Sequence, residues 1–305
     1  MNFSNTKLTE FIIENFIDSA YCVGYRLSEQ NFWEEEVSNF RVLKPCIRYW
    51  YADPIPCSIN DIEYVFVEQY DRFTQIGCIG VGEIRNGKLT RPKTILKRKT
   101  HMSFPVVIFY KGQYYMFPES SSTKSIEIFK MTEDPYHWEP YFSLQLNEKI
   151  VDSAVSVHEN FLLLLTGIEQ ENSLYVKRQI VRIYNLEDIN RISYQIGYTD
   201  SESSLKVRNG GNFQGNYRVI QESTDTDYGM FLALNKVLEF NQEKITEKFC
   251  KRKTVDNINV KLSRFMYRKI GIHTYGRSEN NLEVIDLAVT KLSLLPMSRK
   301  WRKKK

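Results

Sequence analysis

The sequence predicts an all-β protein, a five-bladed β-propeller with a short helical N-terminal extension and a basic C-terminal tail. Aromatic residues make up 13% of the 305 residues, with 19 Tyr and 18 Phe, and strands favour such side chains. Strand-like runs recur at intervals of about fifty residues, the length typical of one propeller blade. No apolar run approaches the roughly 18 residues of a membrane span, and only 14 Gly and 9 Pro exclude a collagen-like or low-complexity chain.

The repeat rests on five short apolar runs. Their last residues, 47 to 55 positions apart, are Glu68, Glu119, Thr166, Gln221 and His273. Upstream of the first four runs lie further strand starts, at Asp53, Ser103, Asp152 and Arg208. A two-sheet sandwich would show turns about every 8–12 residues, but no repeat of about fifty residues. We therefore expect the propeller to span residues 45–290, with the four strand starts converging on one central funnel.

The two ends of the chain are expected to lie outside the propeller. Within residues 1–44, helical spacing of apolar side chains predicts a short amphipathic helix and no signal peptide; the pattern runs through Leu8, Phe11, Ile12, Asn15, Phe16 and Ser19. Residues 291–305 form the tail, and six of its last seven residues are basic, with Trp301 among them. Such a segment, 299–305, suits an anionic membrane surface, at roughly 1 kcal/mol per basic residue. A solubilising terminus is the alternative.

Charge and cysteine usage exclude several classes of function. Without the last seven residues the chain holds 36 basic and 37 acidic residues, and a neutral body argues against a nucleic-acid groove. The five Cys are odd in number and form no C-x-x-C pair, and the four His lack paired spacing. We expect no metal, no cofactor and no disulfide framework. A cytoplasmic location follows, peripheral at the inner face of the membrane if the tail binds there.

A series of motifs resembles a known family. The series begins with Trp50-Tyr-Ala-Asp-Pro54, which looks like the first blade of family 43 glycoside hydrolases, themselves five-bladed propellers. Further motifs follow in order: Phe66-Val-Glu68, Gly77-x-Ile-Gly-Val81, His101-x-Ser-Phe-Pro105, Tyr114-Tyr-Met-Phe-Pro-Glu-Ser120, Asp152-Ser-Ala-Val155, Arg208-Asn-Gly-Gly211 and Gly271-Ile-His-Thr274. Together they are similar to the N-terminal domain of plant glucosamine inositolphosphorylceramide transferase and to stand-alone bacterial relatives, over about residues 48–290. The resemblance implies a place in building glycolipids or surface polysaccharides.

The resemblance also implies roles for single residues. Asp53 stands where the hydrolases carry a general base, and Asp152 where they carry the carboxylate that tunes the acid. Paired carboxylates are the usual tools for making or cleaving a glycosidic bond. The hydrolases' general acid, a Glu opening the fourth blade, is replaced by Arg208. Glu119 or Glu222 could supply an acid instead, whereas an interblade hydrogen bond is the favoured interpretation of Glu68.

Arg208 points to a ligand with an anionic group, since a guanidinium binds phosphate or carboxylate through a fixed fork of donors. The predicted substrate-binding residues are Arg208, His101, Ser103, Gln221 and Trp50. The expected partner is a sugar donor or glycan, with nucleotide-sugar and lipid-linked donors both open. We expect a glycosyltransferase, or a protein supporting one, in cell-surface polysaccharide or glycolipid biosynthesis. A glycoside hydrolase of the family 43-like type and a non-catalytic glycan-binding scaffold are the alternatives.

Overall fold

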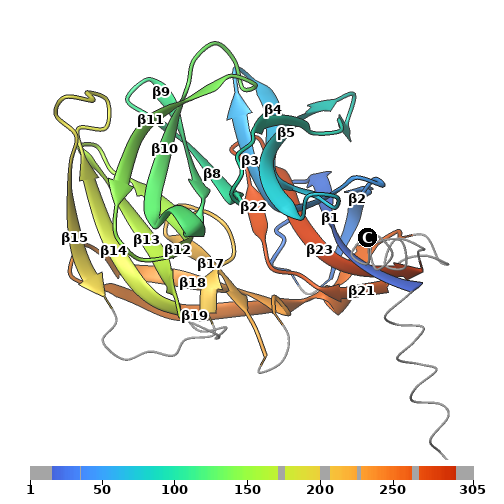
Figure 1. The fold of residues 1–305 in the computed structure, drawn as a ribbon. Helices are drawn as coiled ribbons and strands as arrows, with labels where there is room; N and C mark the ends of the chain where they lie inside the picture. Colours follow the sequence, from blue (N-terminus) through green and yellow to red (C-terminus); the bar gives the residue numbers. More distant parts are fainter. Residues whose placement is uncertain are drawn as a thin grey trace, which may run out of the picture.

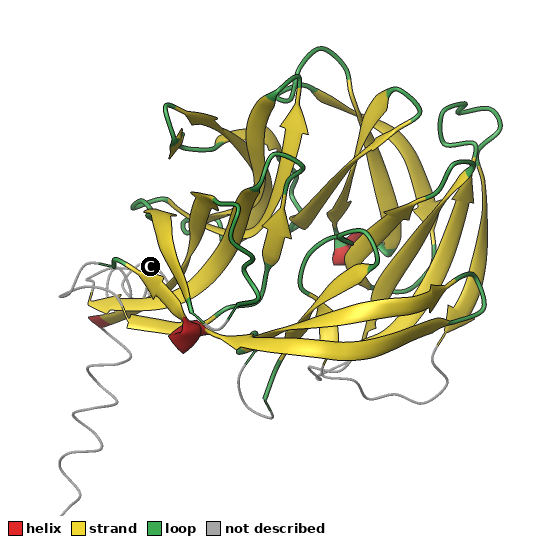
Figure 2. Cartoon of the chain, turned by 180° about the vertical axis from the view of Figure 1, so that it is seen from behind, coloured by secondary structure: helices red, strands yellow, loops and turns green. Residues whose placement is uncertain are grey.

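The computed structural model describes residues 16–34, 36–170, 176–199, 207–224, 228–262 and 268–292. The chain is almost entirely β, and its five sheets follow one another around a ring (Figures 1 and 2). The five-bladed propeller predicted from the sequence is thereby confirmed. The helix predicted near the N-terminus falls mostly on residues 1–15, and residues 299–305 belong to the tail; both lie outside the described residues.

Four blades follow the chain in order, each an antiparallel meander beginning at the innermost strand. The first blade contains β3 (Tyr49–Ile59), β4 (Ile62–Asp71), β5 (Ile76–Arg85), β6 (Lys88–Leu89) and β7 (Lys93–Leu96). The second contains β8 (Ser103–Tyr110), β9 (Gln113–Glu119), β10 (Ser125–Met131) and β11 (Trp138–Gln145), with the 3₁₀ turn η1 (Ser121–Thr123). The third contains β12 (Ile150–Val157), β13 (Phe161–Glu169), β14 (Val176–Tyr184) and β15 (Ser193–Thr199). The fourth contains β16 (Val207–Asn209), β17 (Tyr217–Glu222), β18 (Phe231–Phe240) and β19 (Ile245–Thr254).

The closing blade joins the two ends of the described chain. Its C-terminal strands are β20 (Ile258–Val260), β21 (Arg268–Gly271), β22 (Tyr275–Arg277) and β23 (Leu282–Leu292), preceded by η2 (Val255–Asn257). Its N-terminal strands are β1 (Ile17–Leu27) and β2 (Val37–Leu43). β1 pairs with β23 along its whole length, from Ile17↔Leu292 to Leu27↔Leu282. Residues 17–43 are therefore part of the propeller, and the predicted boundary at residue 45 is wrong.

Hydrogen bonding explains why the N-terminal strands belong to the ring. β21 and β22 pair with one edge of β23, and without β1 the backbone groups of its other edge would face solvent, at a cost that a closed ring avoids. The side chains of β1 are also largely buried, alternately as far as Cys22 and then continuously from Cys22 to Arg26. The helix was predicted mainly from the spacing of the apolar residues between Leu8 and Phe16, and β1 begins immediately after them.

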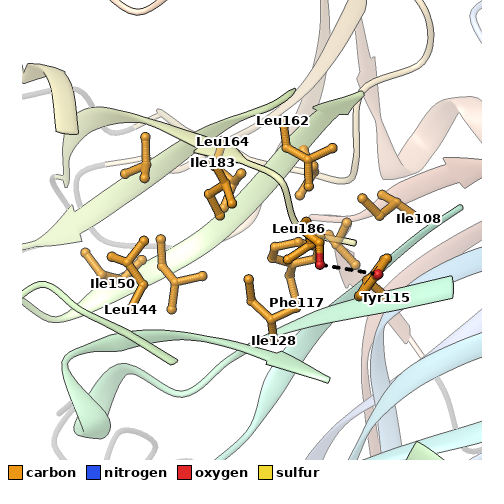
Figure 3. Close-up of a cluster of buried hydrophobic side chains, with 14 of the residues drawn as sticks. Ile108, Tyr115, Phe117, Ile128, Leu144, Ile150, Leu162, Leu164, Ile183 and Leu186 are labelled. Atoms are coloured by element: carbon orange, nitrogen blue, oxygen red, sulfur yellow. Dashed lines mark hydrogen bonds between the residues drawn. The ribbon is translucent and has the colours of Figure 1, made fainter. Parts of the chain in front are cut away.

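The core lies between neighbouring blades, because each sheet is covered on both faces. Leu162–Leu165 on β13 are all no more than 1% exposed, and such a continuous apolar run is typical of a strand buried on both sides. Figure 3 shows the cluster that joins the second and third blades, with Phe117 and Ile128 facing Leu164 and Ile183. Within it the Tyr115 hydroxyl donates to the Leu186 carbonyl at 3.4 Å. Burial of each such side chain contributes about 1.5–3 kcal/mol.

Candidate functional site

A bulge at the same place in three innermost strands builds the site. The pairing register shifts between Ala52 and Ile55 in β3, between Ser103 and Val106 in β8, and between Val151 and Ala154 in β12. Each bulge contains one residue in the left-handed backbone region, and these are Asp53 (φ 47°), Phe104 (φ 44°) and Asp152 (φ 46°). Non-glycine residues in this region cost on the order of 1–3 kcal/mol each and cluster at functional sites. The bulge thus brings two predicted site residues into equivalent positions.

Carboxylates of adjoining blades satisfy the backbone of all three bulge residues. The Asp53 N–H donates to Asp286 Oδ2 at 3.1 Å, and the Phe104 N–H donates to Asp53 Oδ2 at 3.2 Å. The Asp152 N–H donates to Glu119 Oε2 at 2.9 Å. A buried N–H left without an acceptor would destabilise the fold by roughly 1–3 kcal/mol. Asp53 and Glu119 therefore join blades together in addition to any chemical role.

Asp53 belongs to a buried charged chain with His273 and Asp286. His273 Nδ1 lies 2.5 Å from Asp286 Oδ2, and His273 Nε2 lies 3.7 Å from Asp53 Oδ1. The Thr274 hydroxyl also donates to Asp53 Oδ1 at 3.0 Å. Burial raises the pKa of Asp53 to about 6, against the lowering effect of His273. Burial alone would lower the pKa of His273, but Asp286, Asp53 and Asp152 raise it to about 9.

Asp152 forms the centre of a second charged group, with Arg208 and Glu119. Arg208 Nε makes an ion pair with Asp152 Oδ2, and Arg208 Nη1 lies 3.3 Å from the Tyr228 hydroxyl. Burial raises the pKa of Asp152 while Arg208 lowers it. For Glu119, burial and the negative charge of Asp152 raise the pKa to about 8. The four predicted residues Asp53, Glu119, Asp152 and Arg208 thus share one electrostatically coupled funnel.

An aromatic arc adjoins these charged groups. The rings of Trp50 and Tyr70 stack with centroids 4.4 Å apart, and Tyr21 lies 5.3 Å from Trp50. Tyr21 also stacks on His273 at 4.8 Å, and Tyr228 approaches the other side of that imidazole edge-on at 5.5 Å. Aromatic faces beside convergent polar groups are typical of ligand sites. Trp50, predicted to bind substrate, lies in this arc.

The remaining predicted residues lie around the funnel or beneath it. His101 is half-buried, and its Nε2 lies 3.3 Å from Glu68 Oε1. Ser103 is buried on β8, opposite Glu119. Gln221 is buried on β17, where its side-chain amide donates to the Asn209 carbonyl at 3.2 Å, an intrablade contact. Glu222, the alternative acid, pairs instead with Arg252 at 2.7 Å. Substrate contact by any of these residues stays a prediction.

Sequence reasoning missed the part of the site contributed by the closing blade. His273 was predicted only as the end of the fifth apolar run, and Tyr21 lies beyond the predicted helical pattern, which ends at Ser19; the two rings stack in the site. One signal was present in the sequence. Asp286 is the only charged residue in the apolar run Val284–Val289, and a buried carboxylate needs partners. Asp286 accepts the backbone N–H groups of both His273 and Thr274.

Among the described residues, one group has the composition of a metal site. Asp53, His273 and Asp286 bring one ligand atom each to within 4.8 Å of one another. However, His273 Nδ1 already lies 2.5 Å from Asp286 Oδ2, as an ion pair when the imidazole is protonated. We therefore interpret the group as an ion-pair chain. The expectation of no metal and no cofactor stays a prediction.

A separate cavity of about 410 Å³ lies at the opposite ends of the inner strands. It is lined by Ser58, Phe109 and Val157, which follow the bulges of the first three blades, by Gln214 of the fourth blade and by Arg277 of the closing blade. A small pocket of about 10 Å³ lies behind Asp152 and Arg208, between strands of the third and fourth blades. In the described part of the chain, no helix is long and apolar enough to cross a membrane.

Fold and site together define a five-bladed β-propeller with buried, coupled carboxylates where its inner strands bulge. Solved structures of the same fold include the catalytic domain of a GH62 α-L-arabinofuranosidase from Coprinopsis cinerea, with a TM-score of 0.52 and 10% identity over 92% of this chain and 98% of that one. An endo-arabinase from Bacteroides thetaiotaomicron gives a TM-score of 0.53 and 11% identity over 81% and 94%. These likenesses show the fold alone.

The family is shown by sequence. The family model described as glucosamine inositolphosphorylceramide transferase 1, N-terminal, matches residues 45–269, and the chain belongs to this family. The Arabidopsis thaliana protein of that name is 25% identical over 240 residues, which is 72% of this chain and 31% of the relative. The Oryza sativa subsp. indica protein is 26% identical over 210 residues, 64% and 27% of the two chains. The chain thus spans about a third of the length of its curated relatives.

Proposed function

We propose that this propeller transfers a sugar, or directly supports that transfer, in the synthesis of a cell-surface polysaccharide or glycolipid. One observation carries the proposal: Asp53 and Asp152 occupy the same strained bulge position in two blades and are electrostatically coupled. Membership in a family named for a glycosyl transferase supports the choice of substrate class. Strain and perturbed ionisation at one place are typical of functional sites.

Asp53 is the base in this proposal. A pKa of about 6 leaves the carboxylate ionised at neutral pH, yet basic enough to accept a proton from an acceptor hydroxyl. Asp152 belongs to the same group of interacting charges, and the positive charge of Arg208 offsets that of its carboxylate. Because the Nε edge of Arg208 already faces Asp152, an anionic group of the donor would bind through the remaining N–H groups. Trp50 would contribute an aromatic surface to the sugar ring.

A thermal-shift screen tests the ligand class. Purified protein is mixed with nucleotide-sugars, sugar phosphates and neutral oligosaccharides, and a ligand well above its dissociation constant stabilises the fold by a few kcal/mol. A shift with a nucleotide-sugar that disappears in Arg208→Ala supports transfer from that donor. A shift with neutral oligosaccharides alone contradicts the use of an activated donor.

The Asp53→Asn variant then separates catalysis from support. Asn keeps one side-chain oxygen for the Phe104 N–H but removes the base. In a strain lacking the gene, this variant should fail to restore the glycan, while wild type restores it. Full restoration by Asp53→Asn would contradict the catalytic role and favour the scaffold, an interpretation that the interblade hydrogen bonds of Asp53 and Glu119 also favour.

A glycoside hydrolase is the second candidate. Glu119 favours it, because a carboxyl group with a pKa of about 8 is protonated at neutral pH and could act as an acid. Release of reducing sugar from an oligosaccharide, without transfer to an added acceptor, would establish hydrolysis.

We also propose that the chain acts at the inner face of the membrane, through the basic segment 299–305. The proposal rests on the sequence, with six basic residues among the last seven. Flotation of anionic liposomes should carry the full chain but not a chain ending at Pro296. Equal flotation of both would remove the membrane from the proposal.

A further inference from the structure

Glu68 and Glu119 occupy equivalent positions in the first two blades. Glu68 on β4 pairs with Ala52, the residue before the left-handed Asp53. Glu119 on β9 pairs with Ser103, the residue before the left-handed Phe104. Each glutamate is therefore placed to accept the bulge N–H of the following blade. The repeat therefore predicts that both glutamates accept a backbone N–H from the next blade.

The two glutamates are used differently. Glu119 does accept the bulge N–H of the next blade, from Asp152. The equivalent donor for Glu68 is the Phe104 N–H, but that group donates to Asp53 Oδ2 instead. Glu68 Oε1 is buried and accepts no hydrogen bond from the described residues. Asp53 has thus taken over the structural contact, and Glu68 is released from it.

His101 faces the released carboxyl group. The Gly77 N–H donates to His101 Nδ1 at 3.0 Å, and a backbone N–H can only donate. In the neutral imidazole the proton therefore sits on Nε2, which lies 3.3 Å from Glu68 Oε1. Burial lowers the pKa of His101, in agreement with a neutral ring. The imidazole therefore lies beside Oε1 in close contact, although no hydrogen bond joins the two groups in the structure.

The contact between strands leaves room for this pair only because residue 77 is glycine. A Cβ at Gly77 would lie 2.8 Å from both Glu68 Oε1 and His101 Cε1, and 2.6 Å from the Met102 carbonyl. The 46% exposed side chain of His101 also connects the 5% exposed Glu68 to the surface. The pair is therefore closely fitted and still reachable from solvent.

The charges around Glu68 favour its protonated form. Burial raises the pKa of Glu68 well above its ordinary value, and the negative charges of Asp53, Glu119 and Asp286 act in the same direction. The potential cation in direct contact with it is His101, and the hydrogen bond from Gly77 favours the neutral state of that ring. A neutral carboxyl group is the form required of a general acid.

We propose that Glu68 is the proton donor of the funnel and that His101 is its positioning residue, an assignment that rests on the proposed sugar transfer. As the bond from the anomeric carbon to the departing oxygen breaks, its electron pair goes to that oxygen, which takes the proton from the Glu68 carboxyl group. The acceptor hydroxyl forms the new bond to the anomeric carbon and gives its proton to Asp53. After product release, solvent returns the proton from Asp53 to Glu68. An acid is needed for an alcohol-type leaving group, so the substrate class is a glycoside.

Carbon NMR tests the protonation of Glu68 without any substrate. Protein carrying ¹³Cδ-glutamate is titrated from pH 4 to 9 as wild type, Glu68→Gln and the exposed control Glu148→Gln. The resonance absent in Glu68→Gln should keep the shift of a neutral carboxyl at pH 7 and should be unaffected by Glu148→Gln. Titration of Glu68 near the ordinary glutamate pKa of about 4.3 would overturn the acid role.

Leaving-group dependence tests the catalytic step. Wild type and Glu68→Gln are assayed with matched methyl and 4-nitrophenyl glycosides. Glu68→Gln should slow reaction of the methyl glycosides about 10²–10⁴-fold and change the nitrophenyl rates less than about tenfold, because nitrophenolate leaves without a proton. His101→Gln should shift the basic limb of the pH–rate profile. Equal losses for both leaving groups would overturn the acid role.

The two measurements separate this inference from the function on which it rests. Turnover by wild type with an ionised Glu68 at pH 7 would leave sugar transfer in place and remove only the acid. A protonated Glu68 in a protein that turns over none of the glycosides would overturn the acid role, whereas transfer from a nucleotide-sugar would still be decided by the thermal-shift screen.

Discussion

The Asp53 carboxylate accepts the backbone N–H of Phe104 at 3.2 Å, so a residue predicted to act in chemistry also joins two blades. Glu119 has the same double use, because its carboxylate accepts the backbone N–H of Asp152 in the next blade. A large loss of activity in an alanine variant of either acid would therefore mix chemistry with folding. Substitutions to Asn or Gln, measured for stability as well as activity, keep the two effects apart.

Arg208→Ala should destabilise the fold by about 3–5 kcal/mol at neutral pH, because it leaves the buried Asp152 carboxylate without its cation. Urea unfolding measures the loss. Adding Asp152→Asn should recover most of it, since the neutral amide no longer needs a charged partner. A change below about 0.5 kcal/mol in Arg208→Ala would mean that the ion pair does not stabilise the fourth blade.

Asp286→Ala should be among the most damaging single changes. The side chain accepts three backbone N–H groups, from Asp53, His273 and Thr274, and balances the His273 charge. We expect a loss of about 3–5 kcal/mol by denaturant unfolding. The exposed control Glu148→Gln should stay within about 0.5 kcal/mol of wild type. Similar stabilities for the two variants would contradict the proposed charged chain.

Stability should fall as the pH rises from about 6 to 9. The pKa of His273 is raised from 6.5 to about 9 on folding, so its stabilisation is complete below pH 6.5 and is lost as the pH passes about 9. The pKa of Glu119 is raised from 4.5 to about 8, so the folded state also holds this proton longer and loses stability over pH 4.5–8. Both groups act in the same direction, and urea midpoints across this range measure the sum.

The Glu119→Gln variant identifies the glutamate's share of this pH dependence. It should flatten the curve between about pH 5 and 8 and leave the fall near pH 9 in place. An unchanged curve would show that Glu119 titrates at its ordinary pKa in the folded protein.

A shortened chain beginning at Pro45 should not fold cooperatively, although the family match begins there. It lacks β1 and β2, and so the long pairing of β1 with β23 that closes the ring. A chain beginning at Phe16 keeps every described strand and should unfold in one transition. Circular dichroism during thermal unfolding compares the two. A cooperative transition in the shorter chain would contradict the closing role of β1.

The blades could be predicted from the sequence because their signal is local and repeated. Each of the first four inner strands is followed by its own apolar run in the sequence. The spacing of those runs predicts where the inner strands lie, and with them Asp53 on β3, Ser103 on β8, Asp152 on β12 and Arg208 on β16. The coupling among Asp53, Asp152, Glu119 and Arg208 follows in turn, since inner strands of a propeller converge.

The closing blade could not be predicted in the same way. β1 and β23 are more than 250 residues apart in the chain, and their pairing repeats no local pattern. For that reason the amphipathic N-terminus was interpreted as a helix, and Tyr21 and His273 were not expected to stack.

Residue types and spacing alone determined the all-β fold, the five-fold repeat and a funnel containing Asp53 and Asp152. Tertiary structure decided which acceptor each bulge N–H uses. Glu68 and Glu119 are chemically the same and stand at equivalent positions in their blades, yet only Glu119 caps the next bulge. The difference arises because the Asp53 carboxylate already accepts the Phe104 N–H. On β8 the equivalent residue is Phe104, which has no carboxylate to compete with Glu119 for the Asp152 N–H. Competition between acceptors in three dimensions leaves no trace in the sequence pattern.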